Sequence, residues 1–314
     1  MKTRFILNPC SGRNRTRPHL DRTIREFIAA RSLDASCELT DAPGHATELA
    51  RDAVRTGHEL VVAVGGDGTM NEVAQGLVDT PAALALVPCG SGNGLARHLG
   101  LPRSWMGALD LAAGTGSRVV RVDTGTANGL PFFNAMGLGM DADVSRRFNR
   151  LTRRGLRAYA RVAWSALREL RTERCVITGG ATSHTMDILL VAVANSDQYG
   201  NNAQIAPGAR VDDGRLDLVA VAAVGLARAA TLVPRLFLGN LDQSPYVRRL
   251  SGTRFVIDRT STGIIHTDGE THATSARVEV VVRPRSLKIV IPAASRAVAP
   301  VPEATSARFA LQLP

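Results

Sequence analysis

The sequence predicts an α/β domain built on a parallel sheet, followed by a second domain made mainly of antiparallel strands. Over residues 1–123, short apolar runs alternate with amphipathic helical patterns, as in doubly wound α/β layers. Two of these runs, Glu59–Val64 and Ala83–Val87, are almost entirely apolar, which is typical of strands buried on both faces of a parallel sheet. Closely spaced β-rich runs then dominate residues 124–292.

The first domain is expected to alternate strand and helix in order along the chain. Leu20, Ile24 and Phe27 fall on one face of the first helical pattern. Strands are expected at Arg4–Leu7, Ser36–Thr40, Glu59–Val64 and Ala83–Val87, and helices at Pro18–Ser32, His45–Arg55, Thr69–Val78 and Gly94–Leu99.

The second domain, residues 124–292, is expected to contain a basic helical insert at residues 141–171. The tail, residues 293–314, has scattered Pro, Ala and Ser without a period, so it is expected to be loose or to pack back on the first domain. Strands are expected at Met186–Ala194, Leu216–Ala223, Arg254–Asp258, Arg277–Arg283 and Leu287–Ile291.

Charge and composition narrow the class of partner. The chain has 314 residues and a formal net charge of +10, and nearly all of its positive charge is arginine. A basic protein favours anionic partners, namely nucleotides, nucleic acid or an acidic membrane surface. No nucleic-acid-binding motif is recognisable, so a nucleic-acid partner is not expected.

The spacing of the cysteines and the length of the apolar runs indicate the cellular compartment in which the protein is expected. Cys10, Cys37, Cys89 and Cys175 are scattered without a CxxC pair, which favours free thiols in a reducing compartment. The first residues turn polar too soon for a secretory signal, and no run approaches the roughly 18 to 20 apolar residues of a membrane span. We therefore expect a cytoplasmic protein that touches membranes only peripherally.

The strongest motif is the loop Gly65-Gly66-Asp67-Gly68, which follows a buried strand and precedes a helix. Glycines let the backbone approach an anion, and the helix N-terminus offers free N–H groups to phosphate. A plain turn needs neither three glycines nor a carboxylate. We interpret Asp67 as a group on the metal or ribose side, and Thr69 with Glu72 as a capping box. The loop lacks the lysine and spacing of a Walker A motif.

Two further polar loops follow predicted strands in the same way. Gly90-Ser91-Gly92-Asn93-Gly94 offers Ser91 and Asn93 as hydrogen-bonding groups for phosphate or ribose, and Asn8-Pro9-Cys10-Ser11-Gly12 is a weaker third loop. Because the carboxyl ends of parallel strands meet at one edge of a sheet, all three loops are expected to converge there.

Two acidic segments lie in the second domain. Thr267-Asp268-Gly269-Glu270 could supply the carboxylate that accepts a hydroxyl proton in phosphoryl transfer. Alone it would be read as a hairpin turn, since Asp-Gly is a frequent hairpin sequence. The segment 201–217 carries Asp212, Asp213 and Asp217, which could hold a hard cation together with backbone carbonyls; a surface turn is nearly as good an interpretation.

These five motifs, in this order, resemble the diacylglycerol kinase catalytic-domain family, which includes bacterial lipid kinases and the sphingosine and ceramide kinases. The resemblance runs from Asn8 to about Pro292. It implies a nucleotide-binding domain similar to those of NAD kinase and phosphofructokinase, a C-terminal β-sandwich, and ATP in the cleft between them. The activity implied is transfer of a phosphoryl group from ATP to a lipid hydroxyl, with Mg²⁺.

The resemblance also implies roles for particular residues. Asp268 and Glu270 match the catalytic acidic pair, with Asp268 the expected proton acceptor. Asp213 matches a structural Mg²⁺ ligand of bacterial members, with the backbone carbonyls of Arg210 and Arg215 completing that site. Motif match places ATP against Asn8, Pro9, Ser11, Gly12, Thr40, Gly65, Gly66, Asp67, Gly68, Thr69, Asn71 and Ser91, with Asn93 beside them.

One departure from the family pattern affects which lipid is expected as the acceptor. The loop Gly90–Gly94 lacks the Gly-Thr-x-Asn-Asp form of many bacterial diacylglycerol kinases and looks closer to sphingosine kinases. The Asp212-Asp213 region matches bacterial members that hold a metal. Both diacylglycerol and sphingoid lipids therefore stay open as acceptors.

The stretch from Arg146 to Arg174 holds ten arginines and two acidic residues, interleaved with Leu, Trp and Tyr. A basic amphipathic helix of this kind suits an anionic membrane surface. The alternative is a helix docked on the β domain with a solvated basic face.

Two other functions stay in view. A soluble kinase of NAD type shares the Gly-Gly-Asp-Gly loop, and a non-catalytic nucleotide- or lipid-binding regulator would need no acidic pair. A homodimer is possible, because such architectures often pair through exposed strands.

Overall fold

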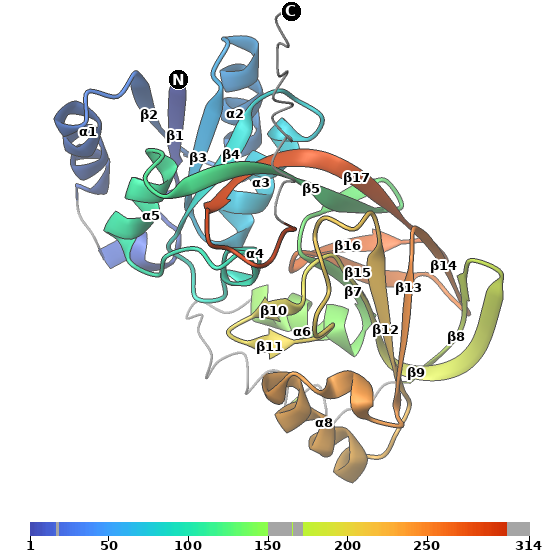
Figure 1. The fold of residues 1–314 in the computed structure, drawn as a ribbon. Coiled ribbons are helices and arrows are strands. Elements are labelled where there is room, and N and C mark those ends of the chain that lie inside the picture. The colour runs from blue at the N-terminus through green and yellow to red at the C-terminus, as the bar shows by residue number, and fades with distance from the viewer. Residues whose placement is uncertain (17–18, 150–164, 166–171, 300–314) are drawn as a thin grey trace, which may run out of the picture.

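The computed structural model describes residues 1–16, 19–149, 165 and 172–299 (Figure 1). An α/β domain and a β-sandwich domain lie side by side, which confirms the predicted fold class. Part of the predicted helical insert, residues 150–164 and 166–171, falls outside the described residues, as does the tail beyond residue 299.

The first domain is built on four parallel strands in the order β2–β1–β3–β4. These are β1 (Thr3–Leu7), β2 (Ala35–Leu39), β3 (Leu60–Gly65) and β4 (Ala83–Pro88). Every residue of β3 is buried, as expected for a strand covered on both faces. The carboxyl ends of all four strands lie at one edge of the sheet, so the loops that follow them are neighbours.

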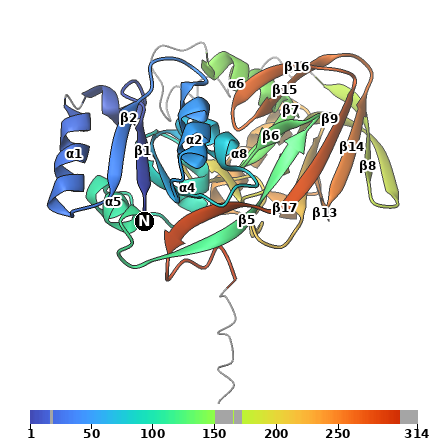
Figure 2. The ribbon, with the colours of Figure 1, turned by 90° about the horizontal axis from the view of Figure 1, so that it is seen from above.

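Helices cover both faces of this sheet (Figures 1 and 2). The chain passes from β1 to β2 in one direction across the sheet and from β2 to β3 in the opposite direction. Because both connections are right-handed, α1 and α2 lie on opposite faces of the sheet. The helix α1 buries Leu20, Ile24 and Phe27, the face predicted from the sequence. The helices are α1 (Leu20–Ala30), α2 (His45–Arg55), α3 (Asp67–Leu77), α4 (Gly94–His98) and α5 (Trp105–Ala112), with a 3₁₀ turn at Gly12–Thr16.

Two long strands join the domains. β5 (Ser117–Ala127) and β17 (Arg277–Pro292) pair antiparallel along almost their whole length, and Figure 2 shows them running from one domain into the other. At Lys288 and Ile289, β17 also pairs in parallel with β4. The last strand of the chain therefore completes the first sheet, which fixes the two domains relative to each other.

The sequence suggested two separate strands here, 277–283 and 287–291, and that prediction was wrong. The structure has one strand with a register shift between Arg283 and Leu287. Pro284 removes a ladder donor and Arg285 takes a positive φ of 52°, so the chain bulges at the point where the pattern suggested a break.

The second domain is a β-sandwich around a core that includes Phe132, Phe255 and Ile257. Its strands are β6 (Leu130–Phe132), β7 (Ala135–Gly139), β8 (Glu173–Gly179), β9 (Thr182–Ala194), β12 (Leu216–Ala222), β13 (Val247–Gly252), β14 (Arg254–Arg259), β15 (Gly263–Thr267) and β16 (Glu270–Thr274), together with the small hairpin β10 (Gln198–Gly200) and β11 (Ala203–Gln204).

A second apolar layer covers the other face of β9 and β12, beneath helix α8 (Leu226–Leu238). Alternate residues of β12 point into the two layers: Leu216 and Leu218 into the sandwich, Val219 and Val221 toward α8. The sequence analysis did not anticipate α8. The remaining helices with described bounds are α6 (Met140–Asn149) and a 3₁₀ turn at Leu241–Gln243.

The segment that follows β17 packs on the first domain. Ser295 donates a hydrogen bond to the carbonyl of Leu99 (2.7 Å), and Val298 is buried in the first core. Arg118 donates to the carbonyls of Ser295 and Val298. Residues 293–299 are thus held against the end of β5.

Thiol reactivity tests the burial pattern. None of the four cysteines forms a disulfide; Cys10 is exposed, while Cys37, Cys89 and Cys175 are buried. Burial raises the pKa of Cys37 to about 11 and that of Cys175 to about 12, so the reactive thiolate is scarce at both sites. With a disulfide reagent at mildly alkaline pH, one thiol should react in the native protein and all four after unfolding. Rapid native reaction of two or more thiols would contradict the fold.

Candidate active site

Three polar loops meet at the carboxyl edge of the first sheet, as predicted. The backbone N–H of Gly66 donates to the hydroxyl of Ser11 (2.7 Å), and the side-chain amide of Asn8 donates to the hydroxyl of Thr69 (3.1 Å). The N–H of Cys89 donates to the carbonyl of Gly65 (2.7 Å). The loop Gly65–Gly68 therefore lies between the other two and bonds to both.

Glycines make this packing possible. Gly12 has a φ of +47°, and a Cβ there would lie 2.1 Å from the carbonyl oxygen of Cys89. A Cβ on Gly90 would lie 2.8 Å from the Cα of Gly66. Such distances are not tolerated between real side chains and backbone, so the loops approach this closely only because these residues are glycines.

The carboxylate of Asp67 joins the first glycine loop to the second. It accepts hydrogen bonds from the backbone N–H groups of Asn93 (2.8 Å) and Gly94 (2.9 Å), at the start of α4. Burial raises the pKa of Asp67, and these two N–H donors oppose that shift. The carboxylate of Asp67 therefore has a structural role in joining the two loops, and its contact with a metal or a ribose stays a prediction.

The predicted capping box at Thr69 and Glu72 was wrong. Helix α3 begins at Asp67, two residues earlier, and its N-cap Gly66 makes no side-chain cap. Thr69 instead accepts from Asn8, and Glu72 accepts from the backbone N–H of Ala46 in the first turn of α2 (3.2 Å). Glu72 therefore does cap a helix, but a neighbouring one, which sequence spacing could not reveal.

The first turn of α3 has the properties of a phosphate site. The N–H groups of Gly68 and Thr69 have no acceptor within the helix. No atom lies within 4 Å of where a Cβ of Gly68 would stand, so the space beside this turn is open. Free N–H groups and the positive end of the helix dipole suit a phosphate chain.

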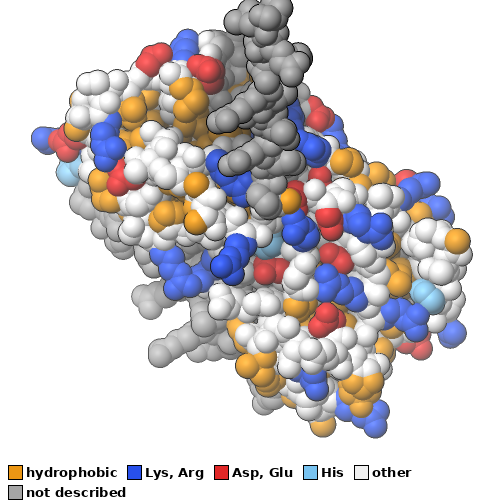
Figure 3. All heavy atoms as spheres, viewed as in Figure 1, with side chains coloured by type: hydrophobic (Ala, Val, Ile, Leu, Met, Phe, Trp, Pro, Cys, Tyr) orange, Lys and Arg blue, Asp and Glu red, His pale blue; other side chains and the backbone are white. Residues whose placement is uncertain are grey.

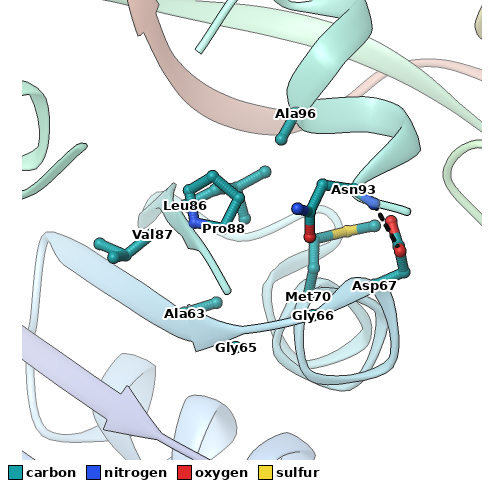
Figure 4. A pocket seen from close by; sticks show the side chains of 10 residues that line it. All are labelled: Ala63, Gly65, Gly66, Asp67, Met70, Leu86, Val87, Pro88, Asn93 and Ala96. Atoms are coloured by element: carbon teal, nitrogen blue, oxygen red, sulfur yellow. Dashed lines mark hydrogen bonds between the residues drawn. The ribbon is translucent and has the colours of Figure 1, made fainter. Parts of the chain in front are cut away.

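A small pocket lies behind these loops, between the ends of β3 and β4 and the helices α3 and α4 (Figure 4). Its lining includes Met70, Pro88 and Ala96, and its volume is about 10 Å³, which is room for about one water molecule. A phosphate chain does not fit this pocket, and its binding on the open side next to Gly68 stays a prediction.

The other predicted nucleotide contacts divide into two groups. Thr40 follows β2 at the same edge, where its N–H donates to the carbonyl of Leu7 (2.9 Å), and Pro9 and Ser91 are exposed there. The side-chain amide of Asn93 forms hydrogen bonds within its own loop. It accepts from the N–H of Gly90 (3.0 Å) and donates to the carbonyl of Gly90 (2.8 Å). Contact of these residues with ATP stays a prediction.

The acidic turn of the second domain faces these loops. Asp268 and Gly269 form a two-residue turn between β15 and β16, both with positive φ, so the hairpin interpretation is confirmed. The side-chain amide of Asn71, on α3, donates to Oδ2 of Asp268 (2.7 Å). The hairpin and the carboxyl edge of the first sheet thus meet, although 197 residues separate Asn71 from Asp268 in the chain.

Three backbone amides hold the carboxylate of Asp268 from the other side. The N–H of Phe133 donates to Oδ2 (2.8 Å), and those of Asn134 and Ala135 donate to Oδ1 (both 2.9 Å). Burial raises the pKa of Asp268, and these donors, with Asn71, lower it. The hydrogen bonds therefore fix the carboxylate of Asp268 in place. Its pKa is nevertheless raised, because the effect of burial is larger than that of the hydrogen bonds. Glu270 is exposed at the start of β16.

The sequence analysis missed a buried cluster beneath this turn. The Nε2 of His266 lies 3.0 Å from Oδ2 of Asp141, both side chains are buried, and the hydroxyl of Tyr199 donates to the same carboxylate. The N–H of Gly269 donates to Nδ1 of His266 (3.2 Å). The cluster therefore supports the acidic turn from α6, β10 and β15. Lone His and Tyr residues in separate strands give no sequence pattern that could reveal it.

The predicted metal ligand Asp213 lies in the turn before β12. Its carboxylate accepts from the N–H of Arg215 (3.0 Å), and its pKa is raised by partial burial and by the neighbouring charges of Asp217 and Asp212. A bound cation would offset this charge, and carboxylate and carbonyl oxygens are ligands that Mg²⁺ accepts, so the residues fit a hard cation. Among the residues that the structure describes, no three His, Cys, Asp or Glu side chains cluster as a metal site.

A glycine-loop edge faced by a partly buried acidic turn, on an α/β domain joined to a β-sandwich, is the arrangement expected of a kinase. Residues 2–151 match the diacylglycerol kinase catalytic domain, and residues 134–291 match the YegS C-terminal NAD kinase beta sandwich-like domain. The chain belongs to the diacylglycerol kinase family, which confirms the resemblance seen in the sequence.

Individual relatives agree with this. A diacylglycerol kinase of Bacillus subtilis (strain 168) is 32% identical over 244 residues, covering 74% of this chain and 79% of that protein. A Pseudomonas fluorescens protein named "probable lipid kinase YegS-like" is 31% identical over 206 residues, 63% of this chain and 68% of that protein. The crystal structure of a diacylglycerol kinase from Bacillus anthracis str. Sterne has the same fold, with a TM-score of 0.72 at 21% identity over 95% of this chain and 98% of that one.

Gly12→Ala tests the close approach of the loops. The added Cβ would meet the carbonyl of Cys89 at 2.1 Å, so the loop must move and nucleotide affinity should fall. Gly180→Ala is the matched control, because Gly180 also has a positive φ (+61°) but no atom within 4 Å of its Cβ position. Both variants should lose roughly 1–2 kcal/mol of stability to backbone strain. In a fluorescent-nucleotide titration only Gly12→Ala should bind more weakly; equal binding by both variants would contradict the packing.

Proposed function

We propose that this protein transfers the γ-phosphoryl group of ATP to a hydroxyl group of a lipid. The observation that carries the proposal is the hydrogen bond from Asn71 to Asp268, because it sets a partly buried carboxylate beside the helix whose first turn offers free N–H groups to phosphate. The relative named diacylglycerol kinase supports diacylglycerol as the first acceptor to test, and a sphingoid lipid is the second.

In this proposal Asp268 accepts the proton of the lipid hydroxyl. Each of its oxygens already accepts two hydrogen bonds, and three of the four come from fixed backbone amides. The fourth donor is the side-chain amide of Asn71, and in this proposal the lipid hydroxyl takes its place at Oδ2. The hydroxyl oxygen then bonds to the γ-phosphorus, the bond to the ADP oxygen breaks, and the proton passes to Asp268.

Replacing the acidic pair one at a time tests this assignment. Asp268→Asn should lower turnover by about 10²- to 10⁴-fold, the usual contribution of a general base. Glu270→Gln should lose less, since Glu270 is exposed and does not contact the held carboxylate. Labelled ATP with mixed lipid micelles measures turnover, and ATP binding with a thermal melt checks that each variant is folded. Full activity of Asp268→Asn, with Glu270→Gln inactive, would move the base to Glu270.

Mg²⁺ enters the proposal in two places. At the active site it would neutralise charge on the ATP phosphates, and since the described residues offer no ready-made cluster, the phosphates themselves would supply much of its coordination. At the turn before β12, Asp213 and the carbonyls of Arg210 and Arg215 would hold a second, structural ion.

The structural ion can be tested without turnover. Mg²⁺ should stabilise the wild type against heat, by about 2.7 kcal/mol at a hundredfold excess over its Kd, and Asp213→Asn should lose this effect. Asp258→Asn is the matched control, because Asp258 is an ion-paired acidic residue on β14, away from this turn. A response of Asp213→Asn equal to that of the wild type would exclude a metal at Asp213.

A lipid substrate requires access to a bilayer, so we include an anionic membrane surface as a peripheral partner. Among the described residues no helix is long and apolar enough to cross a membrane. The basic stretch 146–174, which the sequence suggested for this contact, lies largely outside the described residues.

The alternative functions have less support. The relatives reported above are lipid kinases or named as such, and none of them is specifically an NAD kinase; formation of NADP from NAD would revive that alternative. A regulator that binds ATP without turnover on any acceptor is disfavoured by the buried, positioned Asp268. A lipid-extract screen with mass-spectrometric identification of phosphorylated products would decide among diacylglycerol, sphingosine and ceramide.

A further inference from the structure

Asn195 lies next to the backbone amides that hold Asp268. It follows directly after β9 and is buried, with 1% of the residue exposed. Its side-chain nitrogen Nδ2 donates to the carbonyl of Phe133 (2.9 Å) and to the carbonyl of Asp123 on β5 (2.8 Å). Its Oδ1 has no partner among the residues that the structure describes. The side chain therefore acts in this region through its two N–H donors.

The segment that Asn195 contacts lies outside the strand ladders. Phe133 and Asn134 form a bend between β6 and β7. The ladder between β7 and β9 stops at the pair Ala135–Ala194, so it does not include this bend. The buried carbonyls of the bend therefore need hydrogen-bond donors from elsewhere, because an unpaired buried carbonyl is costly.

Two peptide groups of the bend are held on both sides. A trans peptide points its carbonyl and its N–H in opposite directions, so a partner that fixes one also fixes the other. In the peptide between Phe133 and Asn134, the carbonyl accepts from Asn195 and the N–H donates to Oδ1 of Asp268 (2.9 Å). In the next peptide, the carbonyl of Asn134 accepts from the backbone N–H of Asn195 (2.9 Å), while the N–H of Ala135 donates to the same Oδ1 (2.9 Å).

We propose that Asn195 is a positioning residue for Asp268, because it orients the two backbone N–H groups that bind Oδ1. The inference rests on the proposed function, which gives the positioned carboxylate its role as the base. Without the side-chain amide, the carbonyl of Phe133 loses its donor, and the peptide that it shares with Asn134 is free to rotate. The carboxylate would then lose part of the support that holds its other oxygen, Oδ2, toward the acceptor hydroxyl.

Asn195 suits an experiment because it is buried and carries no charge. Charged side chains of both signs cover the face shown in Figure 3, and replacing any of them would change the electric field at the site. Replacing Asn195 changes no charge, so a change in the titration of Asp268 would reflect the loss of aligned hydrogen bonds. The titratable groups around the turn are the same in both proteins and cancel from the comparison; they are Glu270, His266, Asp141 and His272.

A carbon-13 NMR titration of labelled Asp carboxyl groups tests the positioning without turnover. The signal of Asp268 is identified by its absence from Asp268→Asn. In Asn195→Ala, Asp268 should titrate about one pH unit higher than in the wild type, because weakened hydrogen bonds stabilise its charged form less. Asn128→Ala is the matched control and should leave this titration unchanged. The side chain of Asn128 also donates to a backbone carbonyl, that of Arg277 (3.0 Å), but from the turn between β5 and β6.

Kinetics of the same variants separate positioning from stability. Asn195→Ala should lower kcat by roughly 10- to 100-fold and leave the KM for ATP unchanged, in assays well below the melting temperature of each variant. Asn128→Ala should lower the melting temperature alone. In the Asp268→Asn background, Asn195→Ala should cost little more, because both changes act through one carboxylate.

The outcomes distinguish this inference from the proposed function. If Asn195→Ala does not fold, Asn195→Ser keeps one donor and should show a smaller shift in the same direction. An unchanged titration of Asp268 in the folded Asn195 variant would overturn the inference, as would a fully additive loss of kcat in the Asp268→Asn background. If the titration shifts while Asp268→Asn keeps full activity, the positioning stands and the assignment of Asp268 as the base fails.

Discussion

The carboxylate of Asp268 is the point on which the arrangement of this molecule depends. A buried charge is costly unless hydrogen bonds surround it, and here three backbone amides of residues 133–135 and the side chain of Asn71 supply them. The amides belong to the β-sandwich and Asn71 belongs to the nucleotide domain. The carboxylate that we propose as the base is therefore also a hydrogen-bonded link between the two domains.

Backbone pairing of the long strand β17 also holds the two domains together. β17 belongs to both sheets, since it pairs with β14 and β5 in the sandwich and with β4 in the first domain. A single long strand shared by two sheets leaves little freedom for the domains to rotate. The acidic hairpin is therefore held against the helix that follows the first glycine loop, where Asn71 contacts Asp268.

The sequence by itself determined the strands of the first sheet, the three loops at its edge and the acidic turn, because these depend on local patterns: apolar runs, glycines and an Asp-Gly turn. Tertiary structure decided what those residues do. Asp67 bonds the second loop, Glu72 caps a helix other than its own, and Asn71 reaches Asp268. It also decided that β17 crosses between domains and that α8 keeps one apolar face uncovered. Such facts concern partners far apart in the chain, and no local pattern encodes which of many compatible side chains will be the one in contact.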